Sequence, residues 1–292
     1  MSPWQTNIID EALFELALNE DLGIPWQDVT TDLLFPQLPA QAEAKIFSKH
    51  KEPIRICGIS FVAHLLTKLS RHSQVLTDFQ DGEELPVGAT MLTILTDPHS
   101  LLKAERILLN FLRHSCAIST LTAQYASQVK HTNLKILDTR KTTPGLRHLE
   151  KYAVYCGGGQ NHRMGLYDAV MIKDTHIDLL GGMEKALEKL PLLTSQSLPV
   201  IVEVRSLEEL NIVLEKGQSK VHRVLLDNMN VETLAACVKA CRGIFETEAS
   251  GNIRLDSIVK IAETGVDFAS IGELTYGAGH VDLSMRTSFM SS

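Results

Sequence analysis

Short apolar runs alternate with longer amphipathic stretches throughout the second half of the chain. The helical patterns carry their own end signals: Ser206 and Glu209 form a capping-box pattern, and Gly217 and Gly265 stand where helices are expected to stop. The apolar runs are 134–137, 169–172, 200–204, 223–226, 243–245 and 268–272. Strands joined by helical crossovers predict a parallel α/β barrel, with an open doubly wound sheet as the structural alternative.

The first part of the chain follows a different pattern. Residues 8–20 predict a helix whose apolar stripe packs on a core. That stripe contains Ile8, Ala12, Leu13, Leu16 and Ala17. Between residues 44 and 95, short runs separated by turn residues predict a small antiparallel sheet with helices on it. Residues 101–128 predict a long helix that crosses into the second domain.

These patterns predict two domains of unequal size. We expect an N-terminal α+β sandwich over residues 1–115 and an irregular α/β barrel over residues 116–276. The C-terminal tail, residues 277–292, is expected to return to the N-terminal domain.

Composition narrows the classes of function. A net charge of −7 and a pI near 5.9 argue against sequence-independent binding to nucleic acid or to an anionic membrane surface. No apolar run is long enough to cross a bilayer, and the first residues form an acidic amphipathic pattern, so a soluble cytoplasmic protein is expected. Five scattered cysteines fit reduced thiols, and Cys237 and Cys241 are expected to be core residues, not metal ligands.

Residues 137–177 concentrate positive charge in this acidic protein. From Asp138 to His176 there are six Lys or Arg residues and four carboxylates. Arginine binds carboxylate or phosphate through paired hydrogen bonds, so a small polyanion is the expected ligand. A solvated basic face is the alternative, but these cations stand beside glycines or at the ends of apolar runs.

A barrel places functional residues directly after its strands. The residues in those positions are Arg140, Lys141, Lys173, Asp174, Glu203, Asp227, Asn228, Glu248, Ser250, Gly251 and Gly272. The two glycine-containing tips, 250–252 and 271–272, suggest a phosphate cradle, although either glycine alone could be simple turn chemistry. Glu203 and Asp227 suit the hydroxyls or the Mg²⁺ of a phosphorylated sugar, or they could neutralise Lys141 or Lys173.

The ordered blocks DTRKTTPGLR, EKYAV-CGGG-NHR-GL-DA and IKD-H resemble the quinolinate phosphoribosyltransferases, also called nicotinate-nucleotide pyrophosphorylases (carboxylating). The likeness extends over nearly the whole chain. It implies transfer of phosphoribose from 5-phosphoribosyl 1-pyrophosphate to quinolinate with decarboxylation. The products would be nicotinate mononucleotide, CO₂ and pyrophosphate, in a step of NAD biosynthesis.

The resemblance also implies roles for individual residues. Arg106, supplied by the partner subunit of a homodimer with shared sites, would bind quinolinate together with Arg140, His162, Arg163 and Lys173. Lys141, Glu203, Asp227, Ser250, Gly251 and Gly272 would bind the sugar donor. Lys141, Lys173, Glu203 and Asp227 would be catalytic, with Glu203 and Asp227 holding Mg²⁺ partly through the substrate. For Arg106 the alternative is an exposed i,i+4 partner on a helix, and assembly beyond a dimer stays open.

Some positions depart from the family pattern. Ile201 stands where a glutamate is usual, Thr175 replaces an asparagine, Tyr276 replaces a frequent histidine, and Cys116-Ala117 replaces a small pair. None of these departures removes a residue with an implied role.

Three other functions remain open from the sequence. A related phosphoribosyltransferase for another heteroaromatic acid would share these motifs. A Schiff-base barrel lyase would use Lys173 as its amine. A non-catalytic dimer would only bind an anionic metabolite.

Overall fold

The computed structural model describes residues 11–34, 41–194 and 197–289. The chain forms two compact units, and neither is continuous in sequence. The first contains 1–123, 142–158 and 275–292, and the second contains 124–141 and 159–274. The boundary expected at residue 115 falls inside helix α4 (Pro98–Gln128), and segment 142–158 groups with the first unit.

A four-stranded antiparallel sheet forms the centre of the first unit. Its strand order is β12 (Leu283–Phe289), β1 (Ala42–Ser48), β5 (Thr90–Thr96) and β3 (Gln74–Leu76). The strand from the C-terminal stretch therefore pairs along the whole length of β1, from Ala42 opposite Phe289 to Ser48 opposite Leu283. A second, two-stranded sheet joins β2 (Ile54–Arg55) to β4 (Glu84–Leu85). The helices of this unit are α1 (Glu11–Leu22), α2 (Val29–Leu34), α3 (Ile59–Leu69), most of α4, and α5 (Arg147–Cys156).

Helix α1 buries a different face from the one expected. Phe14, Leu18 and Leu22 enter the core, whereas Leu16 of the expected stripe is 65% exposed. The Phe14 ring packs 4.5 Å from that of Phe61 and 6.3 Å from that of Phe111, so a large aromatic side chain sets the buried face. Ile8, the first member of the expected stripe, lies outside the described residues.

The second unit is a parallel α/β barrel. Its six strands follow the order β6 (Lys135–Leu137), β11 (Phe268–Ser270), β10 (Glu246–Ser250), β9 (Arg223–Asp227), β8 (Val200–Val204) and β7 (Val170–Ile172). The first strand of the unit, β6, pairs with the last, β11, and the other strands follow in reverse chain order, which is the order of a barrel opened between β6 and β7. A doubly wound sheet places its first strand in the interior of the sheet, so this order excludes that alternative. Among the described residues no ladder joins β6 to β7, so the barrel is irregular and open on that side.

Strand β10 corrects one expected element. The apolar run 243–245 is a turn after α10 (Val231–Cys241), and the strand is the polar sequence ETEAS that follows it. Two of its polar side chains are buried because they have partners: Thr247 hydrogen-bonds Asp267, and Glu248 pairs with Arg223. A strand whose buried positions are polar carries no apolar signal.

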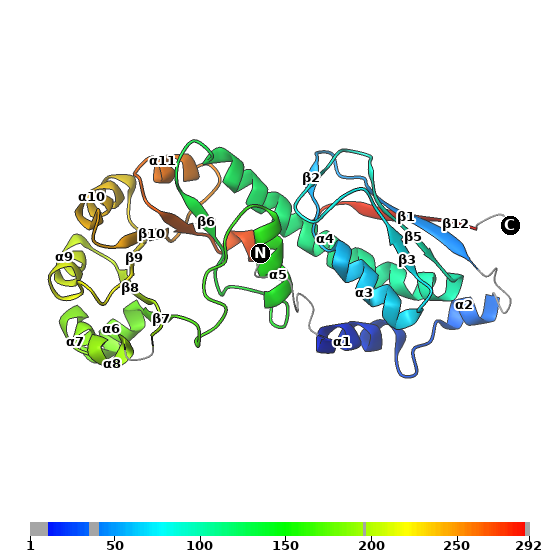
Figure 1. Ribbon diagram of the computed structural model, residues 1–292, viewed down its shortest axis with the longest axis horizontal. Coiled ribbons are helices and arrows are strands. Elements are labelled where there is room, and N and C mark those ends of the chain that lie inside the picture. Colours follow the sequence, from blue (N-terminus) through cyan, green and yellow to red (C-terminus); the bar gives the residue numbers. More distant parts are fainter. Residues whose placement is uncertain (1–10, 35–40, 195–196, 290–292) are drawn as a thin grey trace. The chain divides into compact units, whose positions relative to one another are not determined.

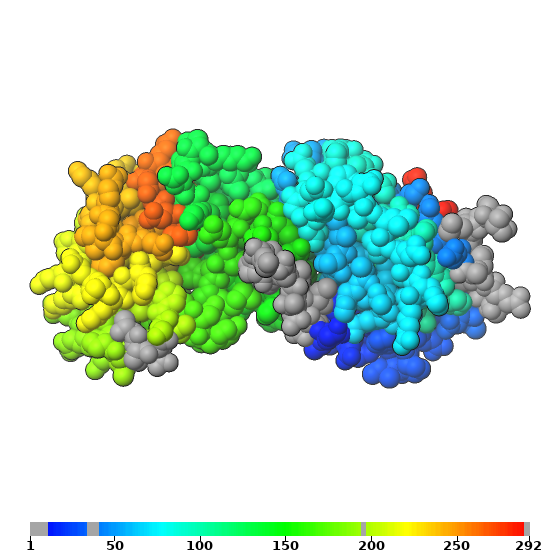
Figure 2. Space-filling view, in the orientation of Figure 1, coloured from blue at the N-terminus to red at the C-terminus, as the bar shows by residue number. Residues whose placement is uncertain are grey.

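Helices cover the outside of the barrel strands, most visibly α9 to α11 around β8 to β10 (Figure 1). The side chains of α9 and α10, yellow to orange, form a continuous outer surface (Figure 2). These helices are α6 (Asp174–Leu180), α7 (Met183–Leu187), α8 (Leu190–Thr194), α9 (Leu207–Lys216), α10 and α11 (Ile258–Ala262); α12 (Glu273–Tyr276) follows β11. Ser206 caps α9 by accepting the Glu209 N–H, but the Glu209 carboxylate binds Arg205, so only half of the expected capping box forms. No described helix has the length and apolar character needed to cross a membrane.

Candidate active site

The strand register brings the expected site residues to one end of the barrel, which we call the barrel mouth. Ile172 lies opposite Val202, so Lys173 and Glu203 follow at the same level. Asp227 lies opposite Ser250, and Ser270, two residues before Gly272, lies opposite both Ser250 and Leu137. Strands β6 to β11 therefore each contribute a polar tip to the same edge.

One side of the mouth, which we call the carboxylate side, consists of Glu203, Asp227 and Lys173. The Glu203 side chain is largely buried, and burial together with the charges of Asp174 and Asp227 raises its pKa above the ordinary value. The Lys173 ammonium and a hydrogen bond from the Asp174 backbone oppose this rise. The excess negative charge makes this side suited to a cation or to hydroxyl donors.

The other side, which we call the cation side, consists of Arg140 and Arg163. Burial and the nearby charge of Arg140 lower the pKa of Arg163, and the Asp168 carboxylate opposes this shift. The Arg163 guanidinium donates through Nη1 to the Ala169 carbonyl at 3.0 Å. Two guanidinium groups held close enough to repel each other form a ready site for an anion with more than one negative charge.

Asp138 organises the loop that carries Arg163, and its role was not expected from the sequence. Its carboxylate is fully buried at the end of β6, where it accepts the Asn161 side-chain amide at 2.6 Å and the His162 N–H at 2.9 Å. Arg163 N–H in turn donates to His162 Nδ1 at 2.7 Å. The available sequence signal was the position of Asp138 directly after an apolar run, as the first residue of the DTRK block.

The tips of β9 and β10 interlock at the expected phosphate cradle. Asn228 donates its backbone N–H to the Ser250 carbonyl at 2.9 Å, and its side-chain amide donates to Asp227 at 2.7 Å. Gly251 has φ +92°, and a Cβ there would overlap the Asn228 side chain and lie 2.9 Å from its backbone nitrogen. Only glycine fits this position, which leaves the backbone of the loop close to any bound group.

The expected cations Lys141 and Arg106 are exposed, and they lie in different units. Lys141 follows β6, and its backbone N–H donates to Thr139 Oγ1 at 3.0 Å. Arg106 lies on α4 in the first unit, so it is not among the residues that the barrel contributes. The positions three and four residues away from Arg106 are Leu102, Lys103, Leu109 and Asn110, so no carboxylate is available for the i,i+4 pair.

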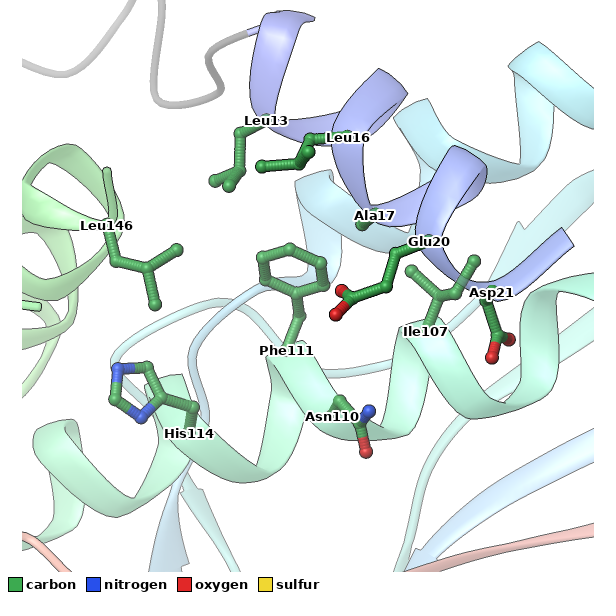
Figure 3. Close-up of a pocket in the computed structure, with 10 residues that line it drawn as sticks. All are labelled: Leu13, Leu16, Ala17, Glu20, Asp21, Ile107, Asn110, Phe111, His114 and Leu146. Atoms are coloured by element: carbon green, nitrogen blue, oxygen red, sulfur yellow. The ribbon is translucent and has the colours of Figure 1, made fainter. Parts of the chain in front are cut away.

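A groove of about 510 Å³ lies beside α4 within the first unit (Figure 3). Leu13, Leu16 and Ala17 of α1 form one wall, so the apolar stripe expected to enter the core instead faces this groove. Figure 3 shows Phe111 and His114 of α4 and Leu146 on the opposite side. The groove is separate from the barrel residues described above, because every residue that lines it belongs to the first unit.

The departures from the family pattern occupy sites with different burial. Ile201 is 5% exposed and packs with Met171 and Leu225 inside the barrel, below Glu203 on the same face of β8. Thr175 is exposed at the start of α6, and Tyr276 is 69% exposed. Cys116 and Ala117 are core residues of α4.

An α/β barrel with a cationic and an anionic side at its mouth defines a class of protein that handles small charged metabolites. Comparison with known proteins identifies the family within this class. Residues 118–286 match the model of the quinolinate phosphoribosyl transferase C-terminal domain, and residues 28–116 match that of the N-terminal domain. The chain belongs to the quinolinate phosphoribosyltransferase family, whose members are decarboxylating transferases.

Individual relatives are similar over almost their whole length. A probable nicotinate-nucleotide pyrophosphorylase [carboxylating] from Synechocystis is 39% identical, over 98% of this chain and 94% of that protein. Quinolinate phosphoribosyltransferase [decarboxylating] 1b from Nicotiana tabacum is 36% identical, over 94% and 81%. The crystal structure of NadC from Streptococcus pyogenes superposes with a TM-score of 0.89 at 33% identity, covering 100% of this chain and 99% of that one.

Proposed function

We propose that this protein transfers the phosphoribosyl group of 5-phosphoribosyl 1-pyrophosphate to the ring nitrogen of quinolinate and releases pyrophosphate and CO₂. The product is nicotinate mononucleotide, in a step of NAD biosynthesis. The observation that carries the proposal is the pairing of two like-charged groups at one barrel mouth, Arg140 with Arg163 and Glu203 with Asp227. In this reaction two anionic substrates lie side by side, and one of them is a sugar. Such a pair requires a mouth with both a cation side and a carboxylate side.

The cation side would bind the quinolinate dicarboxylate. Arg163 and Arg140 supply two guanidinium forks, and a carboxylate can accept paired hydrogen bonds from each. Lys173 lies at the tip of β7 near Glu203, and its ammonium would contact quinolinate and the departing pyrophosphate. His162, in the same loop as Arg163, completes the set proposed for quinolinate.

The carboxylate side would bind the sugar donor. Glu203 and Asp227 accept hydrogen bonds from the ribose hydroxyls, and the loops at Ser250-Gly251 and Gly272 approach its phosphate through the backbone. Lys141 supplies a further point charge for the pyrophosphate. Departure of pyrophosphate leaves positive charge on the ribose ring, which these carboxylates would stabilise.

We propose Mg²⁺ as the cofactor on the same side. Burial and the charges of Asp174 and Asp227 raise the pKa of Glu203, and a divalent cation bound beside these carboxylates would offset their repulsion. No group of three or more His, Cys, Asp or Glu side chains in the described ranges could hold a metal alone, so substrate oxygens would supply the other ligands. When bound, the ion would neutralise charge on the leaving pyrophosphate.

Little further chemistry is asked of the side chains. Alignment of two bound reactants is worth roughly 7–11 kcal/mol in favourable cases, which the two sides of the mouth would provide. Once the ring nitrogen is quaternary, its positive charge stabilises the electron pair that loss of CO₂ leaves on the adjacent ring carbon, and a proton from water then bonds to that carbon. No strong base is required.

We also propose a homodimer with shared active sites. Arg106 is exposed on α4 and has no carboxylate at helical spacing, which leaves its charge available to a second subunit. The neighbouring groove presents apolar side chains of α1 and α4, including the exposed Leu16, as a surface that a partner could cover. Equilibrium sedimentation tests the assembly, and mixing Arg106→Ala with a barrel-mouth variant should restore activity if the sites are shared.

A reducing compartment such as the cytoplasm is the proposed location. All five cysteines are free and buried, which fits a protein that does not depend on disulfides. Fractionation of cells that express the protein would test this proposal.

The decisive experiment mixes the purified protein with Mg²⁺, phosphoribosyl pyrophosphate and quinolinate. We expect release of CO₂ and formation of nicotinate mononucleotide in equal amounts. Tight binding of both ligands without product would favour a non-catalytic binding protein. Turnover of another heteroaromatic acid in preference to quinolinate would favour a related transferase.

The Schiff-base alternative has less support. Lys173 is exposed and lies beside the Glu203 carboxylate, whereas a Schiff-base lysine needs a desolvated amine or a neighbouring cation. Borohydride trapping of a covalent adduct at Lys173 would reverse this preference.

A further inference from the structure

The imidazole of His162 lies between the Arg163 backbone and the Glu248 carboxylate. Its Nδ1 accepts the Arg163 N–H at 2.7 Å, so this nitrogen carries no proton. Its Nε2 lies 3.3 Å from Glu248 Oε1, within ion-pair distance, although the two atoms do not meet in hydrogen-bond geometry. The side chain of His162 is only 7% exposed, and both Nε2 and Glu248 Oε1 are shielded from solvent.

Glu248 is a fully buried carboxylate inside the barrel. Strand alternation places it on the same inner face as Ser250, and on β9 the corresponding inner positions are Arg223 and Asp227. Its Oε2 accepts from Arg223 Nη1 at 3.0 Å, and Arg223 stacks on the Phe268 ring with its guanidinium carbon 3.6 Å from the ring centre. Burial raises the pKa of Glu248, yet its contacts with His162 and Ser270 and the charge of Arg223 bring it below its ordinary value.

These contacts form a continuous column from the barrel interior to the mouth, which we call the Arg223–Glu248–His162 column. The charge of Arg223 balances that of Glu248, so the carboxylate can stay ionised in the core. An ionised Glu248 next to Nε2 favours the tautomer with its proton on that nitrogen. The unprotonated Nδ1 then accepts the backbone N–H of Arg163.

We propose that His162 is a positioning residue, held by Glu248 as the neutral Nε2–H tautomer, and that it sets the backbone from which Arg163 reaches the quinolinate carboxylates. This inference rests on the proposed function and changes the role of one residue in it. His162 then supplies no charge to the substrate, because Nδ1 accepts a backbone N–H and the buried Nε2 faces Glu248. Arg163 and Arg140 carry the recognition of the dicarboxylate on this side of the mouth.

The tautomer can be observed directly by nitrogen NMR of protein labelled with ¹⁵N-histidine, with His162→Gln used to assign the signal among the 11 histidines. We expect the pattern of a neutral Nε2–H imidazole at neutral pH, unchanged when quinolinate is added. Protonation of both nitrogens on addition of quinolinate would overturn the proposal, because it would mean that His162 acts as a cation toward the substrate.

Two amide substitutions test the two ring nitrogens of His162 separately. In His162→Asn the amide oxygen occupies the position of Nδ1 and can still accept from Arg163, whereas in His162→Gln the amide nitrogen occupies that of Nε2 and can still donate to Glu248. If His162 positions Arg163, each amide should retain part of the function, with a KM for quinolinate between those of the wild type and His162→Ala. We expect His162→Ala to raise this KM on the order of tenfold to a hundredfold. Amide variants as impaired as alanine would contradict the positioning role.

Glu248→Gln tests the interior end of the column. We expect a raised KM for quinolinate, an unchanged KM for the sugar donor, and a shifted His162 ¹⁵N signal. Glu246→Gln is the matched control, because Glu246 also pairs with Arg223 but its side chain is 55% exposed. An equal effect of both variants on the KM for quinolinate would show that only the loss of charge near Arg223 matters.

Failure of this inference can be told apart from failure of the proposed function. A wild-type protein that does not turn over quinolinate would refute the function, while the tautomer of His162 in the free protein could still be read. Normal turnover with an imidazolium at His162 would refute only the positioning role. If Glu248→Gln does not fold, the wild-type spectra and the two amide variants still test the positioning role of His162.

Discussion

The two sides of the barrel mouth achieve their charge in opposite ways. Glu203 extends from the rigid strand β8, is 8% exposed, and is held in place by the barrel itself. Arg163 extends from the long connection between β6 and β7 and depends on Asp138, His162 and the Ala169 carbonyl for its position. The carboxylate side is therefore fixed by the fold, whereas the cation side is fixed by a second layer of buried polar groups.

The largest effect should come from removing the Arg163 guanidinium on the cation side. Arg163→Ala is expected to weaken quinolinate binding by about 3 kcal/mol, roughly a hundredfold in KM, because truncation leaves a carboxylate without its partner. The KM for the sugar donor should change little. Steady-state kinetics with each substrate varied in turn measure both, and Arg163→Lys, which keeps charge without the fork, should lie between.

A substitution on the carboxylate side should instead impair use of the sugar donor and leave quinolinate binding unchanged. Asp227→Ala is expected to weaken use of phosphoribosyl pyrophosphate by about 2 kcal/mol, roughly thirtyfold, through the loss of hydrogen bonds to a charged group. Asp227→Asn keeps the shape and should be milder. Kinetics in which Arg163→Ala affects the sugar donor and Asp227→Ala affects quinolinate would refute the assignment of the two sides.

A smaller change is expected from a substitution at Gly251, in the loop after β10. Gly251→Ala should destabilise the fold by about 1 kcal/mol or more and raise the KM for the sugar donor about fivefold, because the residue needs a positive φ and its Cβ would displace Asn228. Gly243→Ala is the control: Gly243 also has a positive φ, +76°, but nothing lies within 4 Å of the added Cβ. The control should lose stability by thermal unfolding while keeping its KM.

The smallest effect is expected from Glu203→Gln, which should stabilise the fold where Gly251→Ala destabilises it. Glu203 has a raised pKa when folded, so the folded chain binds more protons than the unfolded chain between the ordinary value and the raised one, and stability falls as pH rises through that window. At neutral pH the ionised, buried Glu203 therefore destabilises the fold, and Glu203→Gln should unfold at a higher temperature while losing activity. The gain should shrink toward acidic pH.

Glu208 provides the control for that measurement. A hydrogen bond with Ser206 lowers the pKa of Glu208, so its ionised form is favoured by folding. Glu208→Gln should therefore give no gain in unfolding temperature. Equal gains in the two variants would mean that net charge, not the environment of Glu203, sets the result.

The sequence predicted those parts of the fold whose buried residues are apolar. Strand β8, VIVEV, was predicted with its observed bounds because all five of its residues are buried and four are apolar. Strand β10 was placed three residues early because Glu246, Thr247 and Glu248 are polar. The burial of Thr247 and Glu248 depends on Asp267 and on Arg223 of β9, which a local pattern cannot reveal.

The same limit explains which site residues were found. Lys173, Glu203 and Asp227 stand at or just after apolar strands, so the barrel rule located them. Asp138 and Glu248 lie against the loop at His162 from 24 and 86 residues away along the chain. The barrel rule includes Glu248 among the strand-end residues, but the sequence predicts a role in holding this loop for neither residue. Residues that position other residues have no characteristic spacing in the sequence, because only the folded barrel brings them to their partners.

The pairing of β1 with β12 has a consequence for the order in which the protein can be made. The edge of β1 that faces β12 stays uncovered until residues 283–289 have left the ribosome, by which time the entire barrel has been synthesised. The first unit to emerge would thus be the second to be completed, and an exposed strand edge during that interval is a site where nascent chains can aggregate.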